Sequence, residues 1–180
     1  ADLLQRTTLA PQQREYVETI VGTAGNLMHI LNDILDLSQL EAGRMSLSPV
    51  PVQLSDIAEF SQRLFEPMAR EKGIDFQVSC EVRHETVLAD DVRLTQVVNN
   101  LVSNAIKFTE SGSVTLAVSE MGDGNYRFMV EDTGPGIAQD ALGRIFEEFT
   151  QETNDTFRQK GGTGLGLSIT RHLVDAMGGE

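Results

Sequence analysis

The amino-acid sequence predicts an α+β protein in which a helical hairpin is followed by a two-layer α/β sandwich. Two observations predict this class. Apolar residues recur at three- and four-residue steps over one long N-terminal stretch, and segments with helical and with alternating periodicity follow one another after it. The 180 residues, of which 40% are hydrophobic, suffice for one moderate domain with an appendage. We therefore expect one domain over residues 1–45 and a second over 46–180.

The helical pattern of the first domain runs over about 11–42. Pro11 suits a first helical turn, and Gly43 suits the end of the helix. Residues 1–4 are interpreted as the tail of a preceding helix. A hairpin this long cannot bury its apolar stripe alone, so we expect a second copy of the chain to complete a four-helix bundle. The alternative is an amphipathic helix packed on its own domain. The stripe comprises Tyr16, Val17, Ile20, Ala24, Leu27, Ile30, Leu31, Ile34, Leu37 and Leu40.

The second domain is predicted to alternate helices and strands. Residues 46–51 hold two prolines and suit an extended connector, and Ser55 suits the N-cap of the next helix. The alternation of apolar residues over 113–120 predicts a strand that forms a hairpin with its successor. The expected elements are a helix at 55–71, strands at 74–80 and 86–89, a helix at 91–108, strands at 113–120 and 126–130, a helix containing Leu142, Ile145, Phe146 and Phe149, a polar stretch at 150–160 and a helix at 165–177.

The charge of the chain argues against one class of partner. Its 14 Lys and Arg face 27 Asp and Glu, which gives a formal net charge of -13. A surface this acidic repels a phosphate backbone, so no binding to nucleic acids is expected. No apolar run approaches the roughly 20 residues of a spanning helix, so we expect no direct membrane contact of these residues.

Seven of the sixteen glycines lie between residues 134 and 166, and six of them form two groups. The first, Asp-Thr-Gly-Pro-Gly-Ile at 132–137, follows a predicted strand, so that a ligand ring can approach the backbone while Asp132 accepts a hydrogen bond. The same pattern also makes ordinary tight turns. The second, Gly-Gly-Thr-Gly-Leu-Gly-Leu at 161–167, opens the last predicted helix, where bare N–H groups bind anions. The alternative for this group is a flexible glycine linker.

A third group of polar residues lies on the helix expected at 91–108. Asn100 and Asn104 are one turn apart, and Lys107 follows three residues later, so all three share a face. Amide oxygens complete a magnesium shell made largely of water and phosphate oxygens, and an ammonium neutralises phosphate charge. Two asparagines on a helix also occur on solvated faces. However, two of the three lysines in this acidic chain, Lys107 and Lys160, lie beside these groups.

Together and in this order, the three groups resemble the ATP-binding domain of sensor histidine kinases, in the superfamily shared with gyrase, Hsp90 and MutL. The similar segments are an N box at 100–108, a G1 box at 132–137, an F box at 145–149 and a G2 box at 161–167. The stretch 27–43 looks like the second helix of the family's dimerisation and phosphotransfer domain. The sequences of the boxes are most similar to those of hybrid kinases. The resemblance therefore implies ATP-dependent phosphoryl transfer in a two-component phosphorelay.

The resemblance also implies roles for residues at the matching positions. Asn104 would coordinate a magnesium ion that bridges the ATP phosphates, with Asn100 supporting the site and Lys107 contacting phosphate. Asp132 would accept from the adenine amino group, and residues 150–160 would form a mobile lid. The set implied to bind ATP is Asn104, Lys107, Phe108, Asp132, Gly134, Gly136, Ile137, Phe149, Lys160, Gly162, Thr163, Gly164, Leu165 and Gly166.

The family's phosphoacceptor histidine stands in an H box, His-Glu-x-x-Arg-Thr-Pro, and no such string occurs here. His29, His84 and His172 are interpreted as structural or solvated residues. We therefore expect that the chain begins after the phosphoacceptor, ends before the last strands of the sheet and cannot autophosphorylate alone. The resemblance implies a homodimer formed through the hairpin, a receiver domain or response regulator as partner, and a place on the cytoplasmic side of a bacterial protein anchored in the inner membrane.

Two other functions stay open at this stage. An ATP-hydrolysing clamp like gyrase or MutL uses a Glu at the position of Asn100 to activate water, and an amide cannot act as that base. A degenerate, kinase-like binding module would act by pairing with another kinase through its bundle. The intact Asn104 and Asp132 argue against such degeneracy.

Overall fold

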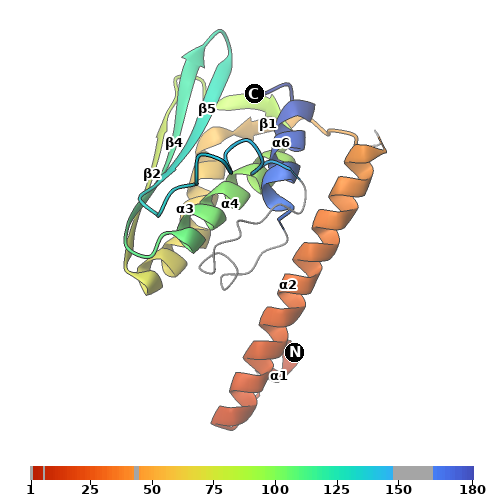
Figure 1. Ribbon diagram of the computed structural model, residues 1–180, viewed down its shortest axis with the longest axis vertical. Helices are drawn as coiled ribbons and strands as arrows, with labels where there is room; N and C mark the ends of the chain where they lie inside the picture. Colours follow the sequence, from red (N-terminus) through yellow and green to blue (C-terminus); the bar gives the residue numbers. More distant parts are fainter. Residues whose placement is uncertain (1, 6, 43–44, 148–163) are drawn as a thin grey trace. The chain divides into compact units, whose positions relative to one another are not determined.

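The computed structural model describes residues 2–5, 7–42, 45–147 and 164–180 (Figure 1). The chain divides into two compact units, Ala1–Met45 and Ser46–Glu180. No helix within the described ranges is both long enough and apolar enough to cross a membrane.

The first unit consists of a short helix α1 (Asp2–Gln5) and a long helix α2 (Pro11–Glu41). The predicted helix over 11–42 is confirmed to within one residue. Its start is held by the side chain of Gln13, which accepts a hydrogen bond from the Ala10 N–H at 3.0 Å. The apolar stripe stays largely uncovered, with exposed fractions from 45% to 59% at Tyr16, Ile20, Leu27, Leu31 and Ile34. Such a row needs a partner surface to be buried.

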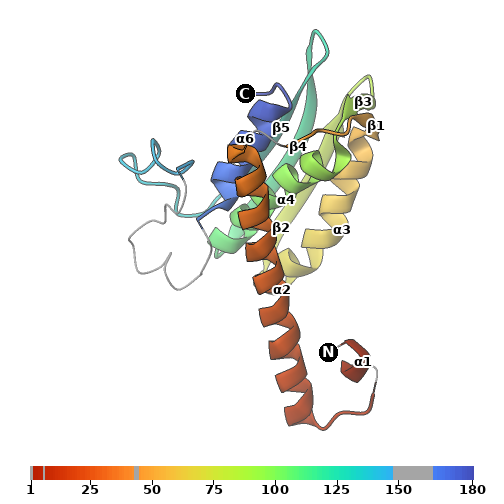
Figure 2. The same cartoon turned by 90° about the vertical axis from the view of Figure 1, so that its right-hand side faces the viewer.

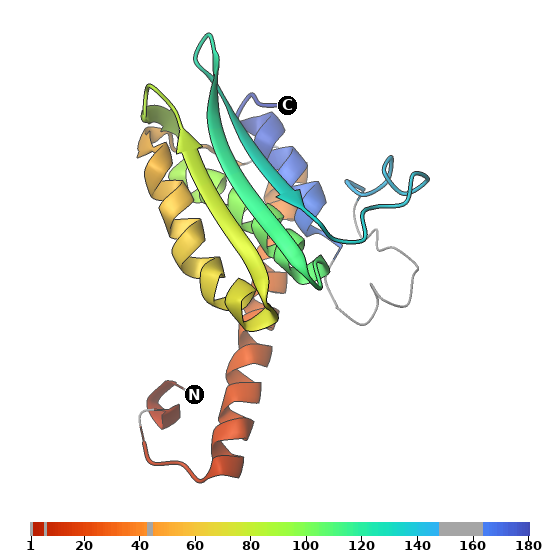
Figure 3. The same cartoon turned by 90° about the vertical axis from the view of Figure 1, so that its left-hand side faces the viewer.

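The second unit is a two-layer sandwich. A three-stranded sheet has the order β2 (Ile74–Glu81), β4 (Gly112–Gly122), β5 (Asn125–Asp132), with β2 and β4 parallel and β4 and β5 antiparallel. One face of the sheet is covered by α3 (Leu54–Lys72), α4 (Asp91–Phe108) and α6 (Gly166–Ala176), as Figure 3 shows. A separate antiparallel pair joins β1 (Val50–Gln53) to β3 (Thr86–Ala89). The α+β class is therefore confirmed.

The core forms where α4 packs on β4. The alternating residues Val114, Leu116 and Val118 turn inward from β4 and are at most 1% exposed. Val98, Val102 and Ile106 recur at four-residue steps along α4 and are equally buried in the same cluster. Because α4 contacts α3 on one side and α6 on the other, it is the central helix of its layer.

The predicted hairpin between β4 and β5 is confirmed. Its connection places Asp123 at φ 54° and Gly124 at φ 77°. Two consecutive positive φ angles are typical of the tight turns whose twist matches that of paired strands. Strand β5 ends at Asp132, where the first glycine group begins, and the earlier strand β3 ends at Ala89, just before α4.

The start of α4 is capped by Asp90. One of its carboxylate oxygens accepts from the Arg93 N–H at 3.0 Å, and the other accepts from the Ser48 N–H at 2.9 Å. Burial alone would raise the pKa of Asp90, but the hydrogen bonds from Ser48 and Arg93 and the charge of Arg93 hold it below its ordinary value. The cap therefore also ties the chain before β1 to the central helix.

Two local expectations at the start of this unit are wrong. Residues 50–53 form a strand that begins inside the connector expected at 46–51, and Pro51 lies opposite Leu88 in a two-stranded pair, where its missing N–H is tolerated. Ser55 does not cap α3. The helix begins one residue earlier, and the Leu54 N–H is satisfied by the Glu85 carbonyl at 2.8 Å.

The helix expected around Leu142 to Phe149 is also wrong over its described part. Residues 139–146 form consecutive turns, with hydrogen bonds such as Arg144 N–H to the Ala141 carbonyl at 2.8 Å. This segment runs away from the sheet (Figure 2). Leu142 and Phe146 are 47% and 39% exposed, so the segment lacks the apolar packing that supplies most of a short helix's stability. Phe149 lies outside the described residues.

Candidate nucleotide site at the end of the central helix

Neighbouring asparagines of α4 hold the helices on its two sides. Asn99 accepts a hydrogen bond from the buried Ser61 hydroxyl of α3 at 2.9 Å. Asn100 points the other way, and its side-chain amide donates to the Gly166 carbonyl and, at 2.8 Å, to the Thr170 hydroxyl of α6. The N box is thereby bonded to the helix that the G2 box opens.

The contact between Asn100 and Gly166 leaves no room for a side chain. A Cβ on Gly166 would lie 2.6 Å from Asn100 Oδ1 and 2.8 Å from Asn100 Nδ2. The sequence pattern marked Gly166 as part of an anion-binding loop, and the structure adds close backbone approach as a second reason for glycine. Gly164, two residues earlier, has φ 71°, which also favours glycine.

The C-terminal end of α4 meets the first glycine group. Asp132 Oδ1 accepts from the Gly134 N–H at 2.8 Å, so the carboxylate closes a small turn after β5. A Cβ on Gly134 would lie 2.7 Å from that oxygen and 3.4 Å from the Phe108 carbonyl oxygen. The turn therefore packs directly beside the last residues of α4. Gly136 has φ 71°, and Ile137 is 45% exposed.

Lys107 is a partly desolvated cation at this end of the helix. Its ammonium lies 5.1 Å from the centre of the Phe108 ring, within cation–π range. Burial lowers the pKa of Lys107. An arriving phosphate would favour the charged form again, because opposite charge nearby counteracts desolvation.

Asn104 has the chemistry of a magnesium ligand that works together with phosphates. It is half-buried, one turn before Phe108. In the described part of the chain no three His, Cys, Asp or Glu residues gather as a metal cluster. A magnesium ion held here would take its hard oxygen ligands from one amide, from phosphates and from water, which suits this ion.

Several positions of the implied ATP set cannot be placed by geometry. Phe149, Lys160, Gly162 and Thr163, with the lid expected at 150–160, lie outside the described residues. The side chain of Leu165 is only 1% exposed, so its backbone alone can face a ligand. Of the remaining members, Asn104, Lys107 and Phe108 lie in the last turns of α4, Asp132 and Gly134 form the turn beside Phe108, and Gly166 contacts Asn100 in the middle of the helix.

Four supporting residues were missed by sequence reasoning. The Thr133 hydroxyl accepts from the Ser113 N–H at 2.9 Å and so anchors the G1 turn to β4. The Lys72 ammonium donates to the Ile106 and Lys107 carbonyls at 2.7 and 3.0 Å. Ser61 and Thr170 bond the paired asparagines. Thr133 stands inside a recognised string, but no signal in the sequence singles out the other three, whose partners are more than 30 residues away.

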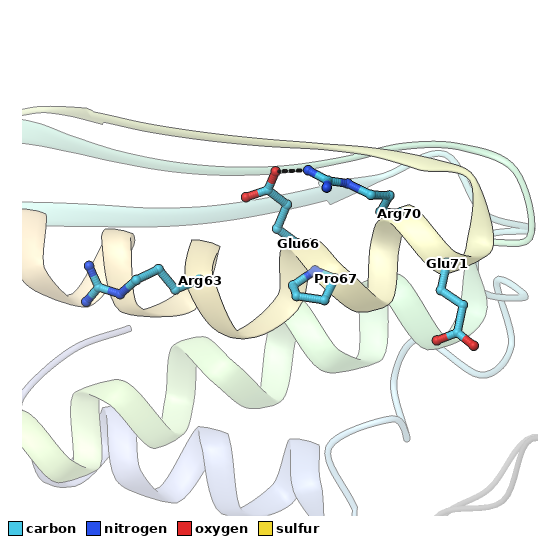
Figure 4. Close-up of a pocket in the computed structure, with 5 residues that line it drawn as sticks. All are labelled: Arg63, Glu66, Pro67, Arg70 and Glu71. Atoms are coloured by element: carbon cyan, nitrogen blue, oxygen red, sulfur yellow. Dashed lines mark hydrogen bonds and ion pairs between the residues drawn. The ribbon is translucent and has the colours of Figure 1, made fainter.

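A shallow hollow on the outer side of α3 is unrelated to these groups. It is lined by Arg63, Glu66, Pro67, Arg70 and Glu71, as Figure 4 shows. None of these residues belongs to the implied ATP set. The Arg70 guanidinium lies 2.8 Å from the Glu66 carboxylate, an exposed ion pair.

Comparison with known families identifies this arrangement. Residues 89–180 match the family described as histidine kinase-, DNA gyrase B- and HSP90-like ATPase. The chain belongs to this family. Residues 1–43 match a second model, the His Kinase A phospho-acceptor domain. The ATPase match lies in the second structural unit, and the His Kinase A match lies in the first.

The relatives of this chain include sensor proteins and histidine kinases. The chain is 41% identical to the sensor protein GacS of Pseudomonas syringae pv. syringae and 38% identical to the histidine-protein kinase BarA of Escherichia coli K12, in each case over 99% of this chain. It spans 20% of the length of each relative.

Solved histidine kinases have the same fold. Full-length ShkA in complex with AMPPNP superposes with a TM-score of 0.80 at 40% identity, covering 98% of this chain and 36% of that one. ThkA in complex with the response regulator protein TrrA gives a TM-score of 0.67 at 26% identity, covering 97% of this chain and 48% of that one.

Proposed function

We propose that this chain is the ATP-binding catalytic region of a hybrid two-component sensor histidine kinase. The observation that carries the proposal is that α4 contacts both of the distant glycine groups. Asn100 bonds to Gly166, and Phe108 packs beside Gly134. The relatives named above are sensor kinases, and the ShkA structure was solved with AMPPNP.

The described residues support a division of labour along a bound ATP. Asp132 has a second carboxylate oxygen, besides the one that Gly134 uses, to accept from the adenine amino group. Phe108, Gly134, Gly136 and Ile137 line the base. Lys107 neutralises phosphate charge, and the N–H groups that open α6 add to it. Phe149, Lys160, Gly162 and Thr163 are proposed to complete the site.

The proposed reaction is phosphoryl transfer to histidine. A ring nitrogen of the acceptor attacks the γ-phosphorus, the bond to the β–γ bridging oxygen breaks, ADP leaves and the imidazole proton passes to solvent. A magnesium ion, held by Asn104, would supply charge neutralisation at the phosphates. The protein contributes positioning and electrostatic stabilisation. Because no H box occurs in this sequence, the acceptor is proposed to be a histidine outside these 180 residues.

Asn100 disfavours an ATP-hydrolysing clamp. Its amide nitrogen is committed as a donor to the Gly166 carbonyl and the Thr170 hydroxyl. An amide in this role cannot remove a proton from water. A degenerate binding module is disfavoured by the packing of Asp132 and Gly134 into an ordered turn beside Phe108.

The test combines binding with transfer. Calorimetric titration of the chain with ATP should show affinity that depends on magnesium, and Asn104→Ala should remove that dependence. Asn99→Ala is the matched control for the magnesium dependence, which it should keep, because Asn99 bonds Ser61 on the side of the helix that faces α3. Radiolabelled ATP is then mixed with the chain and a separate hairpin that carries an H box. Label on histidine supports the kinase, free phosphate alone would indicate the clamp, and neither would indicate the module.

The first unit supports a homodimer as the working state. The exposed stripe of α2 has the length and spacing of a bundle seam, and the His Kinase A match covers it. Leu31→Asp should shift the sedimentation equilibrium of the chain towards monomer. Asn32→Asp, which places the same carboxylate beyond the stripe, should leave it unchanged.

The proposed downstream partner is a receiver domain or response regulator. ThkA was solved in complex with such a protein. A receiver that accepts label from the phosphorylated hairpin in the assay above would support this partner. The parent protein is proposed to be anchored in the inner membrane, with this region on the cytoplasmic side.

A further inference from the structure

Besides Lys107 and Lys160 the chain has one more lysine, and it lies at the same end of α4 as Lys107. Lys72 is the last residue of α3. Its ammonium donates to the carbonyl of Ile106 at 2.7 Å and to the carbonyl of Lys107 at 3.0 Å. Lys72 precedes Ile106 by 34 residues and Lys107 by 35 residues in the sequence. Strands β2 and β3 and most of α4 lie between them.

Those two carbonyls belong to the last turn of α4. The final carbonyls of an α-helix have no N–H one turn ahead to bond with. At the end of α4 the Thr109 N–H reaches back to the Ala105 carbonyl at 3.0 Å, and the next two carbonyls are those that Lys72 bonds. A cation at a helix C-terminus also interacts favourably with the helix dipole.

The peptide groups that Lys72 holds carry the residues proposed to meet ATP. The bonded carbonyl of Lys107 forms the peptide link to Phe108, so the same clamp fixes the start of both side chains. Phe108 in turn carries the carbonyl that packs beside Gly134. Loosening the last turn of α4 would therefore displace a phosphate contact and a base contact together.

We infer that Lys72 is a positioning residue for the nucleotide site, which locks the last turn of α4 so that Lys107 and Phe108 are already placed when ATP arrives. This inference rests on the proposed ATP site and adds a residue that lies outside all four boxes. Lys72 touches no nucleotide itself. Its effect is expected on affinity for the base as well as for the phosphates, since it acts through the backbone that both side chains share.

The experiment measures the dissociation constants of ATP and of adenosine for variants of the 180-residue chain. Lys72→Met keeps the aliphatic stem and should weaken both ligands by about tenfold, the effect of losing a charge-assisted hydrogen bond. Lys72→Arg retains donors and should restore most of the affinity. Lys107→Met should weaken ATP much more than adenosine, because the main interaction that it removes is the one with phosphate.

Two controls separate positioning from general stability. Arg70→Met changes a cation in the same turn of α3 that pairs only with Glu66 in the described structure, as drawn in Figure 4, and should bind like wild type. Ser61→Ala removes the buried link to Asn99 and lowers stability without touching the end of α4. If the two variants have similar urea midpoints, adenosine should bind Ser61→Ala more tightly than Lys72→Met.

The outcomes distinguish this inference from the function on which it rests. Wild-type chain that binds no ATP would overturn the proposed function. Wild-type binding with Lys72→Met unchanged, or weakened only as much as Ser61→Ala of equal stability, would overturn the positioning role and leave the function intact. Loss of ATP affinity without loss of adenosine affinity would also overturn it, because it would make Lys72 a phosphate contact.

Discussion

The side-chain amide of Asn100 lies so close to Gly166 that a Cβ at that glycine would approach Asn100 Oδ1 to 2.6 Å. The two residues are 66 positions apart, and their hydrogen bond joins the middle of α4 to the first residue of α6. The N-terminus of α6, which is proposed to face the phosphates, thus has its position fixed by an amide of the central helix.

Gly166→Ala should therefore weaken ATP binding, by about tenfold or more, because the methyl group must push Asn100 out of its bond or shift the start of α6. The measurement is calorimetric titration with ATP and magnesium. Gly143→Ala is the matched control, since its Cβ would meet nothing within 4 Å and its backbone is not left-handed. Equal affinities in the two variants would show that the contact does not position the loop.

Asp90→Ala should destabilise the second unit by about 1–2 kcal/mol at neutral pH, since it removes an N-cap. The folded-state pKa of Asp90 lies below its ordinary value. A depressed pKa stabilises the fold at pH values above the ordinary value, near 4, and this contribution is lost as the pH falls through the folded pKa. Urea unfolding at pH 7 and at about pH 3 should show the difference from wild type shrinking. A stability difference between wild type and Asp90→Ala that grows in acid would contradict the depressed pKa.

Gly112→Ala should destabilise the sheet by about 1–3 kcal/mol or more. Gly112 has φ 110°, and its Cβ would overlap the Thr133 hydroxyl that anchors the G1 turn. The loss should appear in urea denaturation. Thr133→Ser retains the hydroxyl and should stay close to wild type, whereas a neutral Gly112→Ala would mean that the turn can move away freely.

Gly22→Ala should stabilise α2 by about 0.5–1 kcal/mol, since glycine is a poor helix former and a methyl group at this position would meet nothing within 4 Å. Gly22 lies on the side of α2 opposite the apolar stripe, so sedimentation should show an unchanged dimer equilibrium. Thermal unfolding followed at the helical signal measures the gain. Weaker association would place this face in the bundle seam.

The sequence patterns predicted well wherever one local period decided the structure. The alternation in β4 and the four-residue steps of α2 and α4 give their bounds to within one or two residues. Local reasoning failed where packing decides. Val50 to Gln53 form a strand only because β3 offers a pairing edge, and Leu142 and Phe146 have helical spacing but little to pack against.

The candidate site divides in the same way. Asn104, Asp132 and Gly166 stand in recognisable strings, and in the structure α4 contacts both glycine groups. Lys72 and Ser61 stand in no string. Their importance comes from partners that the chain reaches only after folding, so single-sequence reasoning had no pattern from which to find them.

The opposed bonds of Asn99 and Asn100 have a thermodynamic consequence for ligand binding. Because one asparagine is tied to α3 and its neighbour to α6, α4 cannot roll about its axis without breaking one of the two bonds. Folding has therefore already removed the rotational freedom of α4 that ligand binding would otherwise have to restrict. ATP should therefore meet, at this end of its site, a surface whose ordering entropy no longer opposes association.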